Sequence, residues 1–241
     1  MAIATVSDWK AQAEELQQLL GFEIPAVAIT FQDHVNGTTP FGAPLAPPAA
    51  DGRTGSVAAG CVFWMHATDR TFSTVAADHG NCSVGMMTHG LATLDEVAGN
   101  ADVSEILASG WVSMEAIPGI PVVKERAESI VYGPLAETAV DPDVVLLRLS
   151  ARQLMVLSDA LPGLRIEGKP QCHIVAAAKE QGEVVASVGC QLSRVRTGMS
   201  NQEMTCAIPA RRLAEVLGRL RSTARADRAV ARYAADDAKR F

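Results

Sequence analysis

Four cysteines carry the residue types and placement that could do chemistry in this sequence. Cys61, Cys82, Cys172 and Cys190 lie at expected boundaries between helices and strands, where a side chain can be aimed into a cleft. None forms a CxxC pair, so the close ligand spacing of zinc fingers and ferredoxin-like clusters is missing. Thiolates are soft ligands, and four of them suit an iron–sulfur cluster or zinc. The sequence therefore predicts a soft metal centre, with a 4Fe–4S cluster favoured and zinc as the alternative.

The four cysteines fall into two similarly arranged pairs. Cys61 and Cys82 are 21 positions apart, and Cys172 and Cys190 are 18 positions apart. Cys61 begins or interrupts an expected helix and Cys172 begins one; in each pair a strand follows, and the second cysteine lies just after the strand. This pattern suggests a duplicated Cys–helix–strand–Cys unit. If the two strands are neighbours in one sheet, the thiols converge at one end of it, which requires Cys82 and Cys190 to lie within about 15 Å of each other.

Three further side chains are candidates for catalytic roles beside such a centre. Asp78 and His79 stand at an expected strand end, where His79 can act as a base or a harder ligand and Asp78 can orient its ring. Three thiolates with one open metal position would suit a lyase or dehydratase step. Arg194 can bind a carboxylate or phosphate through paired N–H donors. The remaining candidates to replace a thiol as ligand are His66, His89 and His173.

Two other functions remain open. Cys82 lies near His79 and before an expected helix start, so it could be a nucleophile whose thiolate the helix dipole favours. Alternatively, the chain is a non-catalytic module that holds a small ligand under an irregular loop over residues 33–56, with structural thiols. The sequence contains no GxGxxG, GxxxxGK[ST], HExxH or GxSxG motif, so dinucleotide, P-loop, zincin and α/β-hydrolase chemistry lack support.

The fifth cysteine has a different pattern from the other four. Cys206 alternates with Met204 and Ile208 in an expected strand, so we predict that it is a core residue.

The number of cysteines and the composition indicate the compartment. Five cysteines is an odd number in a chain of 241 residues, which is too long to need disulfides for folding. No apolar run approaches the roughly 18 residues that cross a bilayer, and no secretory leader is evident. We expect a cytoplasmic protein that does not enter a membrane.

Strands interleave with helices along the chain. The hydrophobic pattern predicts a helix over 7–20, a strand over 25–31 and another over 144–149. Ser150 is expected to cap a helix that runs through residue 161. The remaining expected helices cover 57–67, 102–109, 172–180 and the last 30 residues, and the remaining strands cover 71–77, 129–132, 183–188 and 203–208. This order predicts an α/β or α+β fold with a mixed sheet flanked by helices.

Charge divides the chain into an acidic body and a basic end. Residues 210–241 carry nine basic and four acidic side chains, which leaves 12 basic and 23 acidic side chains in residues 1–209. We expect one domain over 1–209 and a helical extension over 210–241 that packs on it and can support a homo-oligomer. The formal net charge of −6 argues against a nucleic-acid partner, so a small molecule is the expected ligand or substrate.

Several cysteine-bearing segments together resemble one known family. They are Cys61 with its neighbours and the segments Gly21–Ile29, His79–Gly85, Gly168–Cys172, Ser187–Arg194 and Ala207–Pro209. Through these segments the sequence resembles the uncharacterised prokaryotic family called domain of unknown function 169. The resemblance covers nearly the whole chain and implies that these segments belong to one domain. It implies no particular chemistry.

Overall fold

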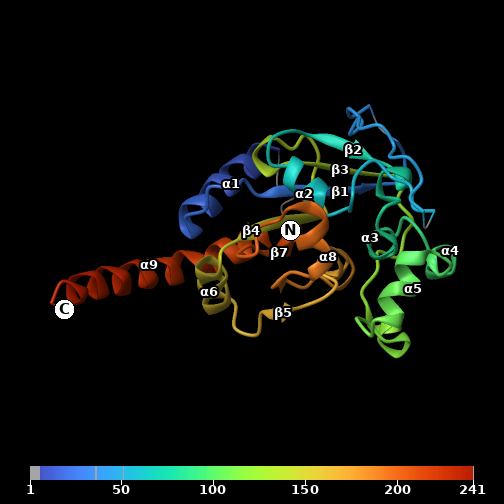
Figure 1. Ribbon diagram of the computed structural model, residues 1–241. Helices are drawn as coiled ribbons and strands as arrows, with labels where there is room; N and C mark the ends of the chain where they lie inside the picture. The colour runs from blue at the N-terminus through green and yellow to red at the C-terminus, as the bar shows by residue number, and fades with distance from the viewer. Residues whose placement is uncertain (1–5, 36, 51, 241) are drawn as a thin grey trace.

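A seven-stranded mixed sheet forms the centre of the protein in this computed structural model, which describes residues 6–35, 37–50 and 52–240 (Figure 1). The strand order is β2-β3-β1-β4-β7-β6-β5. Neighbouring strands are antiparallel except for β5 and β6, which are parallel. The strands are β1 (Val27–Gln32), β2 (Phe72–Thr74), β3 (Ser129–Pro134), β4 (Val144–Leu149), β5 (Arg165–Glu167), β6 (Val185–Ser187) and β7 (Met204–Pro209). The predicted mixed sheet flanked by helices is confirmed.

Three long helices cover one face of the sheet. They are α1 (Val6–Leu20), α6 (Ala151–Ala160) and α9 (Leu213–Ala238), and α9 follows the short turn η5 (Ala210–Arg212). Ser150 caps α6 as predicted, because its hydroxyl accepts from the Gln153 N–H while the Gln153 side chain accepts from the Ser150 N–H. Cys206 is fully buried on this face, in the same cluster as Leu147 and Leu217, so its predicted core position is confirmed.

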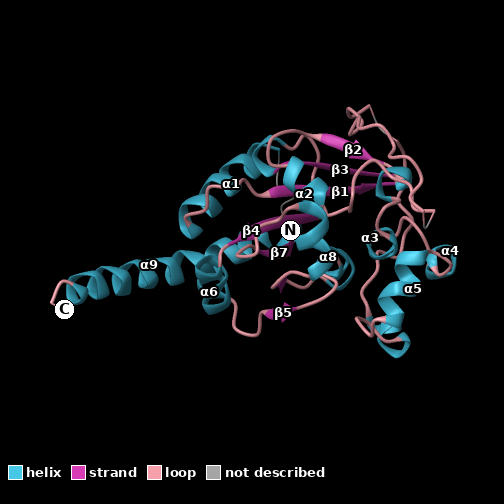
Figure 2. Ribbon diagram, in the orientation of Figure 1, coloured by secondary structure: helices cyan, strands magenta, loops and turns pink. Residues whose placement is uncertain are grey.

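Short helices and irregular segments cover the opposite face, where Phe63, Trp64 and Tyr132 are the largest buried side chains. Helices α2 (Val62–His66), α7 (His173–Ala176) and the π-turn η4 (Ala177–Gln181) pack on it. Figure 2 shows α3 (Ser83–Thr88), α4 (Leu94–Val97) and α5 (Ala101–Ala108) gathered beside one end of the sheet. The other short elements are α8 (Gln191–Thr197), η1 (Ala76–His79), η2 (Met114–Gly119) and η3 (Leu135–Glu137).

The described residues over 33–56 form no helix or strand apart from one bridge between Pro40 and Ser73. Phe41 of this loop inserts into the hydrophobic core on the face of the sheet that α2 covers. There its ring centroid lies 4.9 Å from the ring centroids of both Phe63 and Phe72. The backbone N–H of Phe41 also donates to the Ser73 carbonyl oxygen at 2.8 Å. The loop therefore lies on the same face as α2.

The first part of α9 packs on α1 and α6, and the rest extends away from the sheet (Figure 1). Leu213, Leu217 and Leu220 are buried, whereas Val230 and Tyr233 are 65% and 74% exposed. In the part of the chain that the structure describes, no helix has the length and apolarity that a membrane span requires.

Candidate functional site: a buried group of thiols

Each of the four predicted ligand cysteines is the residue that immediately precedes a short helix. Cys61 precedes α2, Cys82 precedes α3, Cys172 precedes α7 and Cys190 precedes α8. The Cys82 thiol caps its helix, because Sγ accepts from the Gly85 N–H at 3.4 Å. The other three sulfur atoms make no such capping bond.

The strands do not bring the two cysteine pairs together. The expectation of neighbouring strands is wrong: β2 is at one edge of the sheet, and four strands separate it from β6. This separation follows from pairing along the whole sheet, which the local pattern does not encode. The cysteine-bearing helices instead approach one another across the surface of the sheet, where α3 contacts α7.

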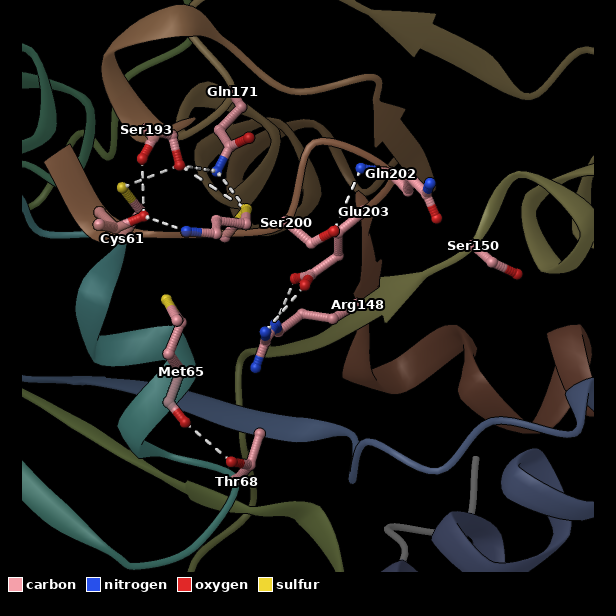
Figure 3. A network of polar contacts seen from close by, with 12 residues as sticks. Cys61, Met65, Thr68, Arg148, Ser150, Gln171, Ser193, Ser200, Gln202 and Glu203 are labelled. Atoms are coloured by element: carbon pink, nitrogen blue, oxygen red, sulfur yellow. Dashed lines mark hydrogen bonds and ion pairs between the residues drawn. The ribbon is translucent and has the colours of Figure 1, made fainter. Parts of the chain in front are cut away.

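Helix α8, which Cys190 begins, is hydrogen-bonded to all three of the other cysteine segments. The Cys61 thiol donates to the Ser193 hydroxyl at 3.4 Å (Figure 3). The Gln171 side chain, next to Cys172, donates to the same hydroxyl at 2.9 Å. The Arg196 guanidinium donates to the carbonyl oxygen of Asn81, the residue before Cys82, at 3.1 Å. Four segments that are distant in the sequence therefore meet around one turn of helix.

The thiols in this group affect one another's ionisation. Burial raises the pKa of Cys61 to about 12; the Ser193 hydrogen bond opposes this shift, and the Cys82 and Cys190 thiols add to it. Burial also raises the pKa of Cys172 well above its usual range, with further contributions from the other three thiols. The four cysteines consequently form one interacting group of thiols. We call Cys61, Cys82, Cys172 and Cys190 the thiol group.

The surroundings of Cys82 favour a protonated thiol. Burial is the main cause that raises its pKa, while the Gly85 N–H and Arg196 lower it. Asp102 lies nearby, where it accepts from the Ser83 hydroxyl at 2.6 Å and from the Ser83 N–H at 3.2 Å, and its charge raises the pKa of Cys82. Since the thiolate is the reactive form, a buried thiol with a raised pKa is a poor nucleophile.

His79 is buried on the same face, but Asp78 does not orient it. The His79 ring bonds to the Thr74 hydroxyl through Nε2 at 3.0 Å. The Asp78 carboxylate accepts from the Val75 N–H at 2.9 Å and thereby closes the turn before His79. Burial holds the pKa of His79 well below its usual range, and the neighbouring His89 lowers it further, so the ring is neutral at pH 7.

Arg194 binds backbone carbonyl groups of the chain itself. The Arg194 guanidinium donates to the carbonyl oxygens of Val188, Ser200 and Glu203, and so closes the loop after α8. Gly189 permits this approach, because a Cβ there would lie 2.5 Å from an Arg194 nitrogen and its φ is +99°.

His66 packs its ring against Phe41 at 5.3 Å, and His173 lies 3.9 Å from a Glu167 carboxylate oxygen. His89, by contrast, is buried beside His79, with ring centroids 6.1 Å apart.

Sequence reasoning did not find Ser193, Gln171 and Met199, the polar and thioether side chains that join the cysteine segments. Gln171 is 1% exposed and lies 3.6 Å from the Met199 sulfur, which is also 3.7 Å from the Ser193 hydroxyl. Cys190 is the N-cap of α8 and Ser193 is the third residue of that helix, so the two lie at the same end of α8. The sequence features that could have pointed to these residues are the position of Ser193 three residues after Cys190 and that of Gln171 directly before Cys172.

The thiol group is not arranged around a single point. Within the described ranges, no three His, Cys, Asp or Glu side chains are grouped as ligands of one metal ion. Four thiolates around one zinc ion would have to stand about 3.8 Å apart, given Zn–S bonds of about 2.3 Å. In a cubane cluster each thiolate binds its own iron, so the sulfur atoms stand farther apart.

Comparison with known proteins gives one match. The sequence profile of the family DUF169, described as "Uncharacterised ArCR, COG2043", matches residues 15–219. The matched range contains all five cysteines and ends within α9. No curated protein and no solved structure matches the chain.

Proposed function

This chain belongs to the DUF169 family, and from that premise and the chemistry of its thiol group we propose that the protein binds a soft metal centre, an iron–sulfur cluster. The proposed ligands are Cys61, Cys82, Cys172 and Cys190. Cytoplasmic location is part of the proposal, because a reducing compartment keeps such thiols available for metal.

The single observation that carries the proposal is the attachment of α8 to the other three cysteine segments. Cys61 and Gln171 each donate a hydrogen bond to Ser193 of α8. Arg196 of α8 donates a third to the carbonyl oxygen of Asn81. Cys190 begins this helix, so its sulfur belongs to the same neighbourhood. Buried polar contacts of this kind are costly to leave unmade, and they hold their segments in a fixed relation.

Electrostatics supports a cation as the occupant. Burial raises the pKa of Cys61, Cys82 and Cys172, so these thiols are neutral in the metal-free protein. Ionising several thiols in one buried place requires a positive charge among them, and Arg196 is the cation that acts on Cys82. Soft metal ions supply that charge and bind thiolates directly, with release of protons.

A cluster suits the thiol group better than a single ion, because the described side chains include no group of three that is arranged as ligands of one ion. A zinc ion would require the four sulfur atoms to move to about 3.8 Å from one another. A cubane cluster spans a larger volume and accepts thiolates from separate directions. Zinc in a closed four-thiolate site is the alternative occupant, and its role would be structural.

An enzymatic role is the further part of the proposal. A cluster held by only three of the four thiolates would have one open iron, which would supply Lewis-acid chemistry that polarises an oxygen of a small substrate, as in a lyase or dehydratase. In that role the chain's own contribution is to exclude water and to hold neutral His79 near Cys61 as a proton acceptor. Gly60, next to Cys61, leaves the space that the His79 ring occupies, because a Cβ at Gly60 would lie 2.9 Å from Nδ1.

Anaerobic purification tests the metal proposal. We expect a brown protein with broad absorption near 400 nm and about four iron atoms per chain. A folded, colourless protein that takes up neither iron nor sulfide would overturn it. A colourless protein with one tightly bound zinc would instead support the structural alternative.

A further inference from the structure

Two buried histidines beside the thiol group have ring nitrogens without a partner. His79 is 1% exposed and His89 is 2% exposed. Among the described residues, His79 Nδ1 and His89 Nε2 have no hydrogen-bond partner. An unpaired buried polar atom costs free energy, so such an atom in a native structure points to an occupant that satisfies it.

The hydrogen bonds of His89 fix its tautomer. Its Nδ1 lies 3.0 Å from the Gly85 carbonyl oxygen, which can only accept. The proton therefore sits on Nδ1, and Nε2 carries a lone pair. Burial lowers the pKa of His89 to about 4, so the ring stays neutral at pH 7 and this lone pair remains available.

The hydrogen bonds of His79 have the same consequence for the opposite nitrogen. Its Nε2 lies 3.0 Å from the Thr74 hydroxyl, which also lies 3.4 Å from the Ile130 carbonyl oxygen. Thr74 has one hydrogen, and the proposed tautomer has it donated to that carbonyl, which can only accept. The hydroxyl then accepts from Nε2–H of His79, and the lone pair is on Nδ1.

Metal-binding histidines show this arrangement. Such a histidine donates its second ring N–H to a carbonyl, a carboxylate or water, which fixes the ring and raises the basicity of the ligating nitrogen. Gly85 provides the carbonyl for His89, and the Thr74 hydroxyl is the equivalent acceptor for His79. The two rings are neighbours, with centroids 6.1 Å apart.

Thiols lie next to both rings and can supply negative charge. Gly60, which lies against His79 Nδ1, directly precedes Cys61. The Thr88 hydroxyl lies 3.3 Å from His89 Nδ1 and also forms a hydrogen bond that lowers the pKa of Cys172. A cation held by two neutral imidazoles would therefore not be isolated in an apolar core.

We propose that His79 Nδ1 and His89 Nε2 form a second cation site, for one divalent ion of borderline softness such as Zn²⁺, beside the thiol group. Imidazole nitrogen suits this class of ion. The pair supplies two protein ligands, and water or a bound ligand completes the coordination. The site is distinct from the proposed cluster, because its ligands are nitrogen atoms that the cluster does not use. An ion on His79 Nδ1 occupies that lone pair, so the proton-acceptor role proposed for His79 belongs to the protein without this ion.

The test is a zinc titration of the metal-free, reduced protein, followed by metal analysis after gel filtration. We expect His79→Gln and His89→Gln each to bind one zinc fewer per chain than the wild type. His66→Gln is the matched control and should bind as much as the wild type. If the two variants retain the full zinc content, the proposal is overturned.

A second measurement does not depend on whether the buried variants fold. Imidazole nitrogen NMR spectra of the wild-type chain should show His79 Nδ1 and His89 Nε2 shifting on zinc addition. Unchanged signals from both would mean that buried water satisfies the two nitrogens, and would overturn the site. Iron loading of the same variants keeps the two proposals apart: absence of iron in the wild type counts against the cluster, whereas loss of zinc in the variants concerns the histidines.

Discussion

The Cys61 thiol donates a hydrogen bond to the Ser193 hydroxyl at 3.4 Å, although the two residues are 132 positions apart in the sequence. The same hydroxyl receives a hydrogen bond from buried Gln171. One small side chain thus joins three segments that carry cysteines, because Cys190 begins the helix to which Ser193 belongs. This relationship places the thiol group on one face of the sheet without help from strand pairing.

Removal of the Ser193 hydroxyl should loosen that junction. Ser193→Ala leaves the Cys61 thiol without its acceptor and removes one partner of Gln171, so we expect a loss of about 1–2 kcal/mol in the free energy of unfolding. Urea denaturation measures it. Ser222→Ala, at an exposed position of α9, controls for the change in helix propensity. Equal stability of the two variants would contradict the assignment.

The buried ion pair between Arg148 and Glu203 should be sensitive to loss of one partner. Arg148 Nη2 lies 2.9 Å from a Glu203 carboxylate oxygen, Nε contacts the other oxygen, and the two side chains are 11% and 9% exposed. Glu203→Gln leaves a buried guanidinium without its counter-charge and should cost about 3 kcal/mol. Arg221→Gln breaks the exposed pair with Glu15 and should cost less than about 1 kcal/mol.

Denaturant titrations of the two variants give this comparison. A further variant, Arg148→Met with Glu203→Met, should recover much of the stability that Glu203→Gln loses, because neither charge is then left unpaired. A cost for Glu203→Gln as small as that for Arg221→Gln would show that the pair is not buried as the structure has it.

Alkaline stability should depend on Cys206. Burial raises the pKa of Cys206 in the folded state, so above the unfolded-state pKa of about 8.5 the unfolded chain releases a proton that the folded chain keeps. Stability from this group is present below that pH and is lost as pH rises, at up to about 1.4 kcal/mol per pH unit. Measured between pH 8 and 10, the slope should be shallower in Cys206→Ala. An unchanged slope would mean that Cys206 does not titrate differently in the two states.

The tautomers of the two buried histidines offer a direct spectroscopic check. In the metal-free protein near pH 7, long-range proton–nitrogen correlations should show His89 protonated at Nδ1 and His79 protonated at Nε2. The Gly85 carbonyl requires this assignment for His89, and donation of the Thr74 hydrogen to the Ile130 carbonyl gives it for His79. His34, whose Nδ1 lies 2.7 Å from the Asp33 carboxylate, is the internal reference for an exposed ring. The opposite tautomer at His79 would remove the lone pair from Nδ1.

Much of the local structure could be predicted because its signals are local. The apolar β-branched run of β4 matches the predicted bounds 144–149, and Ser150 with Gln153 forms the predicted cap of α6. Cys206 alternates with apolar neighbours and is buried as that pattern indicates. In each case the determining contacts lie within a few positions of one another.

The rest depends on contacts between distant segments. The edge strand β5 has three residues and no buried side chain, so its hydrophobic pattern is weak. The separation of β2 from β6 follows from pairing across the whole sheet. The part played by Ser193 depends on where α8 packs, which spacing along the chain does not determine. Burial of His79 and His89 arises in the same way, from aromatic neighbours on α2 and β1.

Iron and acid-labile sulfide per chain, measured after anaerobic reconstitution of single-cysteine variants, test the central claim most directly. The account predicts about four iron atoms in the wild type and in Cys206→Ala, and a marked loss in Cys61→Ala, Cys82→Ala, Cys172→Ala and Cys190→Ala. Circular dichroism shows which variants are folded, and Cys206→Ala controls for loss of a buried thiol. Folded variants of the thiol group that keep the full wild-type iron content, or a wild-type protein without iron, would contradict it.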